Sequence, residues 1–385
     1  MRDKQPSRPL RVMHLMFMLR TGGMELGVAK LANGLDRSRV LSSICSCLPA
    51  EPRARMGVDA RVPLFELRRR DGNDPVLVAR LYRLFRRERP DVVHTHAWGT
   101  LCEGLLAAKA AGVPVMIHGE HGTLQTRRHT RPVQRWAWGR TDQVLSVSSV
   151  LADRMAADVG FPRDRVRVIR NGVDLARFSG AHREEARRRL GLPAGDIVIG
   201  SVGRLHPVKD QQLLLRAVQG LRSEGLAVRG IVAGSGDLLP SLEAEAARLG
   251  LGDAFRFLGD CRDIERVLAA MDIFALPSRS EGLSNTILEA MASRLPVVAT
   301  RVGGTPEIVS EERTGLLIPP QDPGALTAAL RTLVQHPDRR VEMGERGRRR
   351  ACGEFSLERM FAGYEQMYEE VWARSGRTRS LVEAA

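Results

Sequence analysis

Short apolar runs that favour β-strands alternate with stretches of helical periodicity along the first half of the chain. The strand-like runs lie at 10–18, 91–95, 114–117, 143–147 and 166–169, and helical stretches lie at 24–35 and 98–111. Parallel strands need long, right-handed crossover connections, usually through a helix. The alternation therefore predicts a mostly parallel sheet.

A second alternating unit begins near residue 195. Strands are expected at 196–202, 228–233, 255–258, 273–276, 296–299 and 315–318, and helices at 211–224, 238–249, 264–271 and 287–292. The chain then forms a last amphipathic helix at 357–374. The repeat of the same alternation predicts a second doubly wound domain.

The boundary between the two units is expected at 178–195, where Ser179-Gly180 precedes an arginine-rich run at 183–189. We expect an α/β protein with two doubly wound, Rossmann-like domains that face each other across a ligand cleft. The first domain comprises residues 1–180, joined by the C-terminal helix at 357–385, and the second comprises residues 181–356.

The chain length of 385 residues suits two domains better than one core. Hydrophobic residues make up 43% and charged residues 27%, which is typical of globular proteins. No apolar run approaches the roughly 18 residues that a membrane span needs. The apolar stretch at 12–19 contains His14 and ends at Arg20, so it is too short and polar for a signal peptide. Because the five cysteines are scattered and form no disulfide framework, we expect a cytoplasmic protein.

The net charge is +14, from 59 basic and 45 acidic residues, and nearly all the basic residues are arginine. This balance fits either a GC-rich genome or attraction to polyanions such as nucleic acid, anionic lipid or phosphorylated small molecules. Aromatic residues make up only 4%, and no zinc-finger or RNA-recognition signature occurs. We therefore expect no nucleic-acid partner.

Arginines concentrate between residues 61 and 90, beside a stretch at 76–85 whose apolar residues follow helical spacing. Such a helix can rest on an anionic membrane surface, with Arg83, Arg86 and Arg87 at the height of the lipid phosphates. Alternatively, it packs on the first sheet and its arginines are only solvated. The first of these two alternatives predicts peripheral association with the inner face of the plasma membrane.

The densest chemical signal is the segment 277–291, which follows an expected strand and opens an expected helix. A helix start offers unpaired N–H groups and a positive dipole end, which together bind anions. We expect the phosphates of a ligand on the backbone of four residues: Ser284, Asn285, Thr286 and Ile287.

Two glutamates flank this helix start. If the eight residues from Glu281 to Glu289 were all helical, they would rise by about 12 Å, so the carboxylates could hold the two ends of an extended ligand. The alternative is that Glu281 caps the helix and Glu289 is a solvated side chain.

A basic signal follows the strand expected at 196–202. Arg204 and Lys209 lie on a loop between strand and helix, where two cations suit a diphosphate, although they also fit a plain charged surface. Gly234-Ser235-Gly236 also follows a strand, and this short pattern is weak because it fits an ordinary tight turn.

In the first half, Gly22 and Gly23 lie between a strand and a helix, where the backbone either approaches a ligand closely or forms a plain turn. His94 and His96 lie on one side of a strand and have no clear carboxylate partner, and no Asp-x-Asp pattern occurs. We therefore expect no metal site.

Taken together, the chain resembles the retaining nucleotide-sugar glycosyltransferases of the GT-B fold, known as glycosyltransferase family four. The resemblance covers roughly residues 10–370 and rests on these elements in order: Gly22-Gly23, His121-Gly122, Asn171-Gly172-Val173-Asp174, Gly203-Arg204 with Lys209, and Glu281 with Glu289. The opening segment also has a faint likeness to transferases of bacterial exopolysaccharide and exosortase systems.

Two positions depart from the family pattern. Ser284 stands where the family often has glycine, which is expected to tighten the phosphate loop. His118 and His121 compete for the single catalytic histidine of the family, and Gly122 after His121 favours the latter.

The resemblance implies transfer of a sugar, with retention, from a nucleotide-diphosphate sugar to a hydroxyl acceptor, without metal or other cofactor. Arg204 and Lys209 would clamp the leaving diphosphate, and Glu281 and His121 would contact the donor sugar. The implied donor-binding residues are Gly22, Gly23, Gly203, Cys261, Ser284, Asn285, Thr286, Ile287 and Glu289.

Within this set, the resemblance implies that Glu289 holds the ribose and that Cys261 borders the base through its backbone. It also implies that the helix at 357–374 crosses back to the first domain. The acceptor would be a glycan or a lipid-linked glycan in exopolysaccharide, lipopolysaccharide or glycolipid synthesis.

Two other functions stay open from the sequence. A nucleotide-sugar epimerase shares the two-domain architecture, but it needs acid–base residues around the sugar, and the first domain offers no convincing carboxylate pair. A basic lipid- or nucleic-acid-binding module would explain the charge but not the two glutamates beside a helix start. The donor sugar, base, acceptor and oligomeric state are not predicted.

Overall fold

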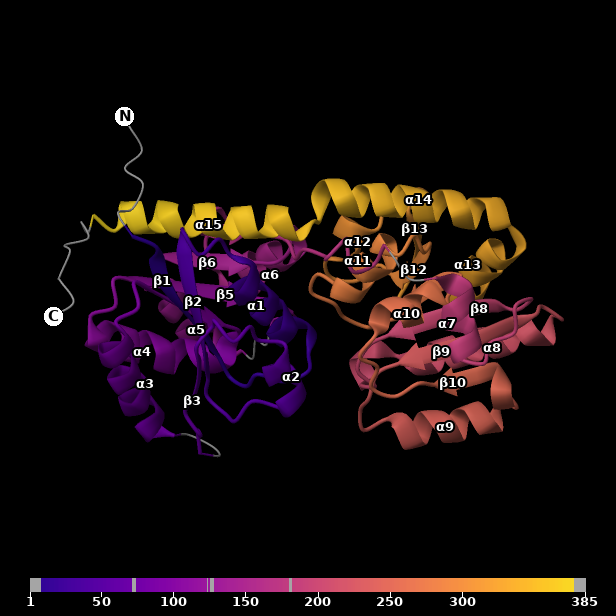
Figure 1. Ribbon diagram of the computed structural model, residues 1–385, viewed down its shortest axis with the longest axis horizontal. Helices are drawn as coiled ribbons and strands as arrows, with labels where there is room; N and C mark the ends of the chain where they lie inside the picture. The colour runs from indigo at the N-terminus through magenta and orange to yellow at the C-terminus, as the bar shows by residue number, and fades with distance from the viewer. Residues whose placement is uncertain (1–7, 71–73, 123, 125–127, 180–181, 377–385) are drawn as a thin grey trace. The chain divides into compact units, whose positions relative to one another are not determined.

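The computed structural model describes residues 8–70, 74–122, 124, 128–179 and 182–376. The chain divides into two compact units. The first unit comprises Met1–Arg170 and Glu358–Ala385, and the second comprises Asn171–Leu357. In each unit, helices pack against a central sheet (Figure 1).

The boundary between the units lies after Arg170, earlier in the chain than the predicted division between residues 180 and 181. The N–H of Val173 donates to the carbonyl of Phe355 at 2.8 Å, and Val173 forms a bridge with Ser356. These contacts hold the segment from Asn171 onward in the second unit. The arginine-rich run that suggested the later boundary is a helix of that unit, α7 (Arg183–Arg189).

Among the described residues, the first unit contains a seven-stranded parallel sheet in the order β3-β2-β1-β4-β5-β6-β7. Its strands are β1 (Leu10–Met16), β2 (Val40–Ser46), β3 (Leu64–Glu66), β4 (Val92–His96), β5 (Val115–Glu120), β6 (Gln143–Ser146) and β7 (Val166–Val168). Its helices are α1 (Gly23–Gly34), α2 (Pro52–Met56), α3 (Pro75–Glu88), η1 (Trp98–Thr100), α4 (Leu101–Ala111), α5 (Arg131–Trp138), α6 (Ser149–Val159), η2 (Arg163–Arg165) and α15 (Leu357–Arg374).

The described part of the second unit contains a six-stranded parallel sheet in the order β10-β9-β8-β11-β12-β13. Its strands are β8 (Ile197–Val202), β9 (Val228–Ala233), β10 (Phe255–Phe257), β11 (Ile273–Leu276), β12 (Val297–Thr300) and β13 (Gly315–Ile318). Besides α7, its helices are η3 (Pro207–Lys209), α8 (Gln211–Ser223), α9 (Leu239–Arg248), η4 (Gly252–Ala254), α10 (Ile264–Ala269), α11 (Asn285–Ala292), α12 (Thr305–Ile308), α13 (Pro323–Gln335) and α14 (Pro337–Glu354).

The two sheets share one topology, in which the strand order reverses beside the first strand of each unit. The reversal lies between β1 and β4 in the first sheet and between β8 and β11 in the second. Ligands of doubly wound sheets bind outside the carboxyl ends of the strands at such a switch point. The topology therefore directs attention to the loops that follow these strands.

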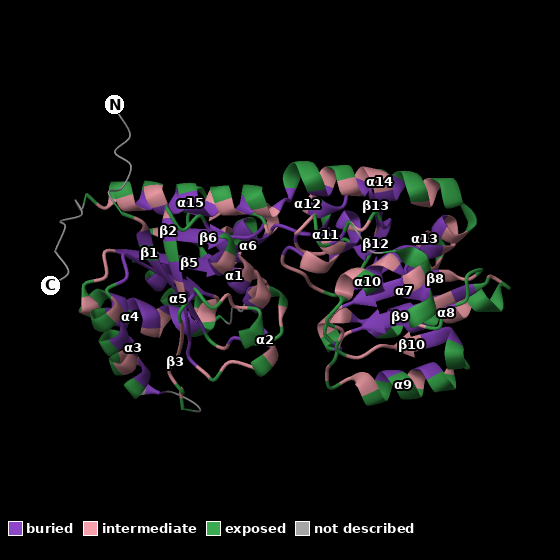
Figure 2. Ribbon diagram, viewed as in Figure 1, coloured by how far each residue is buried: buried purple, intermediate pink, exposed green. Residues whose placement is uncertain are grey.

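The apolar runs form the buried strands, because parallel sheets covered on both faces favour continuous hydrophobic segments. Figure 2 shows the strands largely buried, while the helices alternate buried and exposed faces. Every predicted strand forms, but β2 and β3 were not anticipated. Strand β2 contains the serines Ser42 and Ser46, both buried, which interrupt its apolar pattern.

The last helix, α15, belongs to the first unit. Its buried side chains include Tyr364 and Tyr368. Ion pairs with Arg39 also attach it to the first unit. Arg39 donates to Glu369 at 2.8 and 2.7 Å and also pairs with Glu365. The end of the chain thus contributes to the core built by its beginning.

Candidate functional site

The lysine loop (residues 203–210) follows β8, and the glutamate loop (residues 277–284) follows β11, so both lie at the switch point of the second sheet. Their two charged residues meet: Lys209 Nζ lies 2.6 Å from Glu281 Oε1. The side chains are 21% and 8% exposed, respectively. The structure therefore joins two predicted residues that are 72 positions apart in the sequence.

Arg204, the other predicted cation, is exposed on the same loop. Its carbonyl accepts a hydrogen bond from Gln211 Nε2 at 2.9 Å, which fixes the backbone. Its guanidinium forms no hydrogen bond or ion pair with any residue that the structure describes. Because Lys209 is already neutralised by Glu281, Arg204 carries the uncompensated positive charge of this pair of cations.

The helix start that we predicted as an anion site is the start of α11. The hydroxyl of Ser284 caps the helix by accepting from the N–H of Ile287, and it lies 3.2 Å from the Thr286 hydroxyl. Helix starts leave N–H groups without intrahelical partners, and α11 starts at Asn285. The predicted helix start is thus present, and phosphate binding there stays a prediction.

The two glutamates are not separated by a continuous helix, so their predicted spacing is wrong. Helix α11 begins at Asn285, so only the second half of the stretch from Glu281 to Glu289 is helical. The 12 Å estimate for a continuous helix does not apply. Since Ser284 caps the helix and Glu281 pairs with Lys209, the alternative that Glu281 is the cap is also wrong.

Close backbone contacts hold the glutamate loop in place. Gly303 has φ of +51°, and a Cβ there would lie 1.8 Å from the carbonyl oxygen of Glu281. Gly304 N–H donates to the Gly282 carbonyl at 2.8 Å, and Asn171 Nδ2 donates to the Leu283 carbonyl at 3.0 Å. Asn171 opens the Asn-Gly-Val-Asp signature, so this signature supports the loop rather than only marking its position.

A second set of contacts holds the lysine loop. A Cβ on Gly234 would lie 2.0 Å from the Gly203 carbonyl oxygen, so the weak Gly-Ser-Gly pattern marks a close approach of two loops. Arg279 Nε donates to Asp210 at 2.9 Å and its N–H donates to the Val208 carbonyl at 2.8 Å. Sequence reasoning missed these supports, because each pairs residues from different strand ends.

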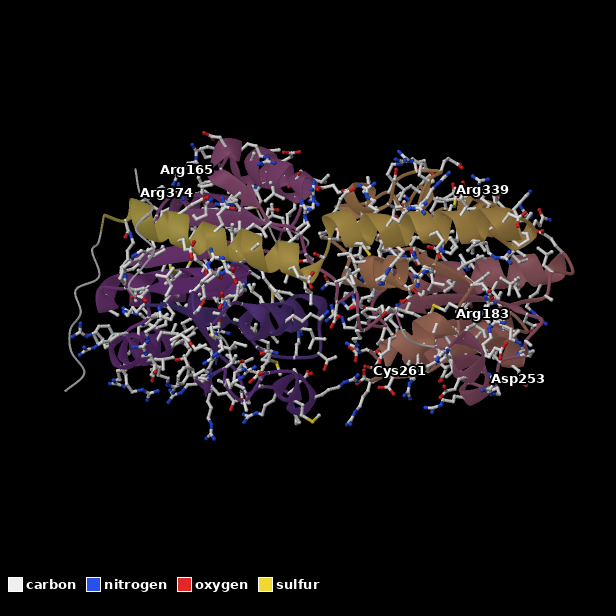
Figure 3. All side chains as sticks on the ribbon, turned by 45° about the horizontal axis from the view of Figure 1, so that its top comes forward. Arg165, Arg183, Asp253, Cys261, Arg339 and Arg374 are labelled. Atoms are coloured by element: carbon white, nitrogen blue, oxygen red, sulfur yellow. The ribbon has the colours of Figure 1, made fainter. Side chains whose placement is uncertain are left out.

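Cys261, labelled in Figure 3, lies on the loop after β10 in the second unit and is partly exposed. Its Sγ lies 3.6 Å from the Leu258 carbonyl oxygen. The Gly259 carbonyl of this loop accepts from the Gly234 N–H at 2.7 Å. The Cys261 loop is therefore joined by a hydrogen bond to the loop beside Gly203.

In the first unit, Gly22 is the N-cap residue of α1 and Gly23 begins the helix. The buried carboxylate of Glu25 lies against this turn: a Cβ on Gly22 would lie 2.4 Å from its Oε2. Arg20 Nε donates to Glu25 at 2.8 Å. An anion at this helix start would therefore meet an acidic side chain as well as N–H groups.

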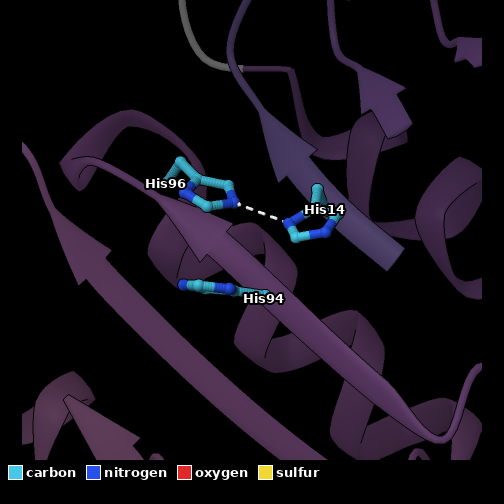
Figure 4. A group of neighbouring side chains, drawn as sticks. All are labelled: His14, His94 and His96. Carbon is cyan, nitrogen blue, oxygen red and sulfur yellow. Dashed lines mark hydrogen bonds between the residues drawn. The ribbon is translucent and has the colours of Figure 1, made fainter. Parts of the chain in front are cut away.

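Histidines gather at the switch point of the first sheet, where the register sets His14 of β1 opposite His94 of β4. Figure 4 shows His14, His94 and His96 together, and their ligating nitrogens all lie within 4.8 Å of one another. We call His14, His94, His96, His118 and His121 the histidine cluster. The sequence analysis did not connect His14 with the others, because only strand pairing brings it beside them.

The two candidates for the catalytic histidine have different environments. His118 is fully buried and uses both ring nitrogens, with Thr95 Oγ1 at 2.9 Å and Glu120 Oε1 at 3.1 Å. His121 is partly exposed, and its Nε2 lies 2.8 Å from His96 Nδ1. Of the two, only His121 has a ring nitrogen, Nδ1, without a hydrogen-bond partner among the described residues.

Four members of the histidine cluster, His14, His94, His96 and His121, are neutral near pH 7. Burial lowers the pKa of His14 to about 3, and burial together with nearby His118 lowers the pKa of His121 to about 4. Burial, followed by the neighbouring histidines, lowers the pKa values of His94 and His96 well below their ordinary value. Imidazoles crowded away from water cannot all carry a charge.

The arginine-rich helix α3 packs on the first unit by its apolar side. Leu77, Leu81 and Phe85 are buried, whereas Arg83 and Arg86 are exposed. The apolar side is therefore not available to enter a lipid surface, and the packing alternative describes it correctly. In the described residues we find no helix with both the length and the apolar character to span a membrane.

Comparison with known proteins identifies the family of this chain. Two family models match, Glycosyltransferase Family 4 over residues 21–177 and Glycosyl transferases group 1 over residues 182–350. A D-inositol 3-phosphate glycosyltransferase from Saccharomonospora viridis is 34% identical over 306 residues, which cover 74% of this chain and 70% of that protein. The chain belongs to glycosyltransferase family 4.

Another family 4 relative, the D-inositol 3-phosphate glycosyltransferase of Salinispora arenicola, is 33% identical over 317 residues, covering 74% of this chain and 70% of that protein. Family membership makes the protein a glycosyltransferase rather than an epimerase or a non-catalytic binding module.

Solved structures place this glycosyltransferase in the GT-B fold. Anabaena Alr3699/HepE in complex with UDP-glucose matches with a TM-score of 0.84 and 22% identity over 94% of this chain and 100% of that one. A glycosyltransferase from Rickettsia africae matches with a TM-score of 0.82 and 19% identity over 94% and 98%. At this identity the likeness shows the fold, which confirms the two Rossmann-like domains predicted from the strand pattern.

Proposed function

We propose that this glycosyltransferase moves a sugar from a nucleotide-diphosphate donor to a hydroxyl acceptor with retention of anomeric configuration. The observation that supports this most is the arrangement around α11 in the second unit. There, the Lys209–Glu281 ion pair, the exposed residue Arg204 and the capped helix start come from loops at one switch point. Cations and helix N–H groups together suit a diphosphate.

In the proposed reaction, the bond from the anomeric carbon to the diphosphate breaks and a bond to the acceptor oxygen forms. The acceptor proton passes to an oxygen of the leaving diphosphate, so no protein nucleophile and no metal are needed. Arg204 and Lys209 stabilise the charge that develops on the diphosphate. Glu289 holds the ribose, and Glu281 releases part of its hold on Lys209 to contact the sugar.

Within this proposal, the donor-side roles of Gly22, Gly23, Gly203, Cys261 and His121 remain predictions. We propose only that the donor is a nucleotide-diphosphate sugar. The contacts described in the second unit do not distinguish a UDP-sugar from a GDP-sugar. HepE was solved with UDP-glucose, which makes UDP-glucose the first donor to test.

We propose a glycan or lipid-linked glycan as acceptor, in synthesis of exopolysaccharide, lipopolysaccharide or glycolipid. The relatives act on D-inositol 3-phosphate, so this compound is the natural soluble acceptor for comparison. We also propose a cytoplasmic protein that associates at most peripherally with the membrane, through exposed arginines rather than an inserted apolar face.

The experiment starts from a thermal-shift screen of nucleoside diphosphates and nucleotide sugars, because a ligand that binds the folded state raises the melting temperature. The donor that stabilises the protein is then incubated with it in the presence of a chelator, and the anomer of the transferred or hydrolysed sugar is identified. A retained anomer, formed with chelator present, supports the proposal. An inverted product, or activity that requires a divalent ion, contradicts it.

A further inference from the structure

Three histidines form a continuous hydrogen-bonded chain from the core of the first unit to its surface. His14 Nδ1 lies 3.1 Å from His96 Nε2, and His96 Nδ1 lies 2.8 Å from His121 Nε2. His14 and His96 are fully buried, whereas His121 is partly exposed. The partly exposed ring of these three is therefore held by a buried pair.

Counting protons leaves two possible directions for these hydrogen bonds. A neutral imidazole has one N–H donor and one acceptor, and His96 uses both nitrogens, so one must donate and the other accept. Either His14 donates to His96 and His96 donates to His121, or both hydrogen bonds run the opposite way.

The inner end of the chain distinguishes the two directions. His14 Nε2 is buried and has no hydrogen-bond partner among the described residues. If the hydrogen bonds are donated outward, from His14 toward His121, this nitrogen is an acceptor without a donor. If they are donated inward, from His121 toward His14, it is an N–H without an acceptor. Orphaned buried N–H groups are rarer than unmet acceptors, so the outward direction is favoured.

We propose that His14 and His96 are positioning residues that fix His121 in the tautomer with its proton on Nδ1. His121 then presents an N–H donor, and it is not a general base. The inference rests on the proposed function in assigning the ligand: the group that His121 contacts is an oxygen that accepts a hydrogen bond, such as a sugar hydroxyl or a phosphate oxygen.

The same rings also invite a metal interpretation, and the hydrogen bonding argues against it. Both nitrogens of His96 are already engaged, by His14 and by His121. The remaining member of the trio, His94, binds Tyr368 OH at 2.8 Å through Nδ1. Ligating histidines usually donate their second N–H to a carboxylate or carbonyl, and neither His14 nor His94 has such a partner among the described residues.

The test reads the tautomer directly and needs no activity. The full chain, without a histidine tag, is labelled with ¹⁵N at histidine, and long-range ¹H–¹⁵N spectra at neutral pH report which nitrogen of His121 carries the proton. Single variants assign the signals. A proton on Nδ1 supports the proposal, and a proton on Nε2 overturns it.

Variants of the buried pair show whether it sets the tautomer. His96→Leu removes the donor and should give His121 a mixture of tautomers, whereas His96→Asn keeps an amide donor near the Nδ1 position and should restore the Nδ1 form. His94→Leu is the matched buried control, because His94 lies outside the chain, and it should leave His121 unchanged. A His121 signal that stays the same in His96→Leu overturns the proposal, as does one equivalent of bound zinc that shifts His14 and His96. Should His96→Leu not fold, His96→Asn and His14→Asn carry the comparison.

Kinetics provide a second readout if transfer is found. His96→Leu should lower turnover by about fivefold to tenfold, the effect of losing one neutral hydrogen bond, with unchanged affinity for the nucleoside diphosphate. His96→Asn should recover it. Because the tautomer is measured on protein without substrate, a failure of the proposed transfer reaction leaves that measurement intact, and the two hypotheses fail separately.

Discussion

The loops of the second unit and the histidine cluster of the first unit treat charge in opposite ways, although both lie at the switch point of a similar sheet. The second unit keeps full charges at its site: Lys209 faces Glu281, and the guanidinium of Arg204 has no partner among the described residues. In the first unit, neutral imidazoles occupy the strand ends at the switch point, beside the Arg20–Glu25 ion pair, and the arginines of α3 lie outside. The difference teaches that one topology can present either an ionic or a neutral polar surface, depending on the few residues at the strand ends.

The strongest way to break this comparison is to remove charge from the second unit. Lys209→Ala should reduce turnover at saturating donor a hundredfold or more, because loss of a preorganised charge contact costs about 3 kcal/mol in the transition state. Arg216→Ala, which removes an exposed cation of α8 in the same unit, is the matched control and should retain activity. A near-normal rate for Lys209→Ala, with the melting temperature preserved, would refute its role.

The two glutamates should separate under calorimetry with a nucleoside diphosphate. Glu289→Ala should weaken binding by roughly tenfold to a hundredfold, since hydrogen bonds to charged groups contribute about 1.5–3 kcal/mol. Glu281→Ala should preserve or tighten binding, because it frees the Lys209 cation while damaging sugar transfer. Glu243→Ala, an exposed change on α9, serves as control. Equal losses in the two variants would remove the distinction between their roles.

The neutral cluster of the first unit predicts a loss of stability in weak acid. The pKa values of His14 and His121 are depressed to about 3 and 4, so the unfolded chain binds protons that the folded chain refuses. The stabilisation is complete above about pH 6.5 and is lost as the pH falls toward these values, at about 1.4 kcal/mol per pH unit for each histidine.

Urea unfolding at pH 7.0, 6.0 and 5.5 measures this effect above the range in which carboxylates titrate. The midpoint should fall with pH in the native sequence and less steeply in His94→Leu, whereas the exposed change His336→Gln should follow the native sequence. A midpoint independent of pH over this interval would show that the cluster is not held neutral.

The smallest effect on stability is expected for the outer charge of the first unit. Replacing Arg83, Arg86 and Arg87 by glutamine should change the free energy of unfolding little, since a surface substitution typically changes it by about 0.5 kcal/mol or less. The melting temperature should therefore be nearly unchanged. The same variant should release the protein from anionic vesicles, at about 1 kcal/mol per arginine. Sedimentation with phosphatidylserine vesicles at low and high salt checks this, since salt screens the attraction. Native protein that ignores such vesicles at low salt would exclude a membrane role for α3.

The fold was accessible from the sequence because its signals are local. A buried parallel strand such as β8 is a continuous apolar run, and the helix start at Ser284 carries its own capping residue. Strand β2 escaped because buried serines with hydrogen-bond partners, such as Ser46, look like loop residues in a linear pattern.

The candidate site was accessible only in part, because its decisive contacts are between distant segments. Lys209 and Glu281 could each be singled out, but not their ion pair, which depends on the neighbouring positions of β8 and β11. The same holds for His14, whose partner His96 is 82 positions away. The contact of Gly303 with Glu281 has no sequence signal at all, since a glycine with positive φ resembles any turn.

The return of the chain to its first unit has a consequence for biosynthesis. A ribosome makes the strands of that unit first, yet the residues that cover its interior at Tyr364 and Tyr368 emerge last, after the entire second unit. The first unit therefore keeps part of its apolar surface uncovered until α15 is made, whereas all the residues of the second unit are made before that helix. The order of completion is the reverse of the order of translation, and a nascent chain halted before α15 would expose the histidine-lined interior to chaperones and proteases.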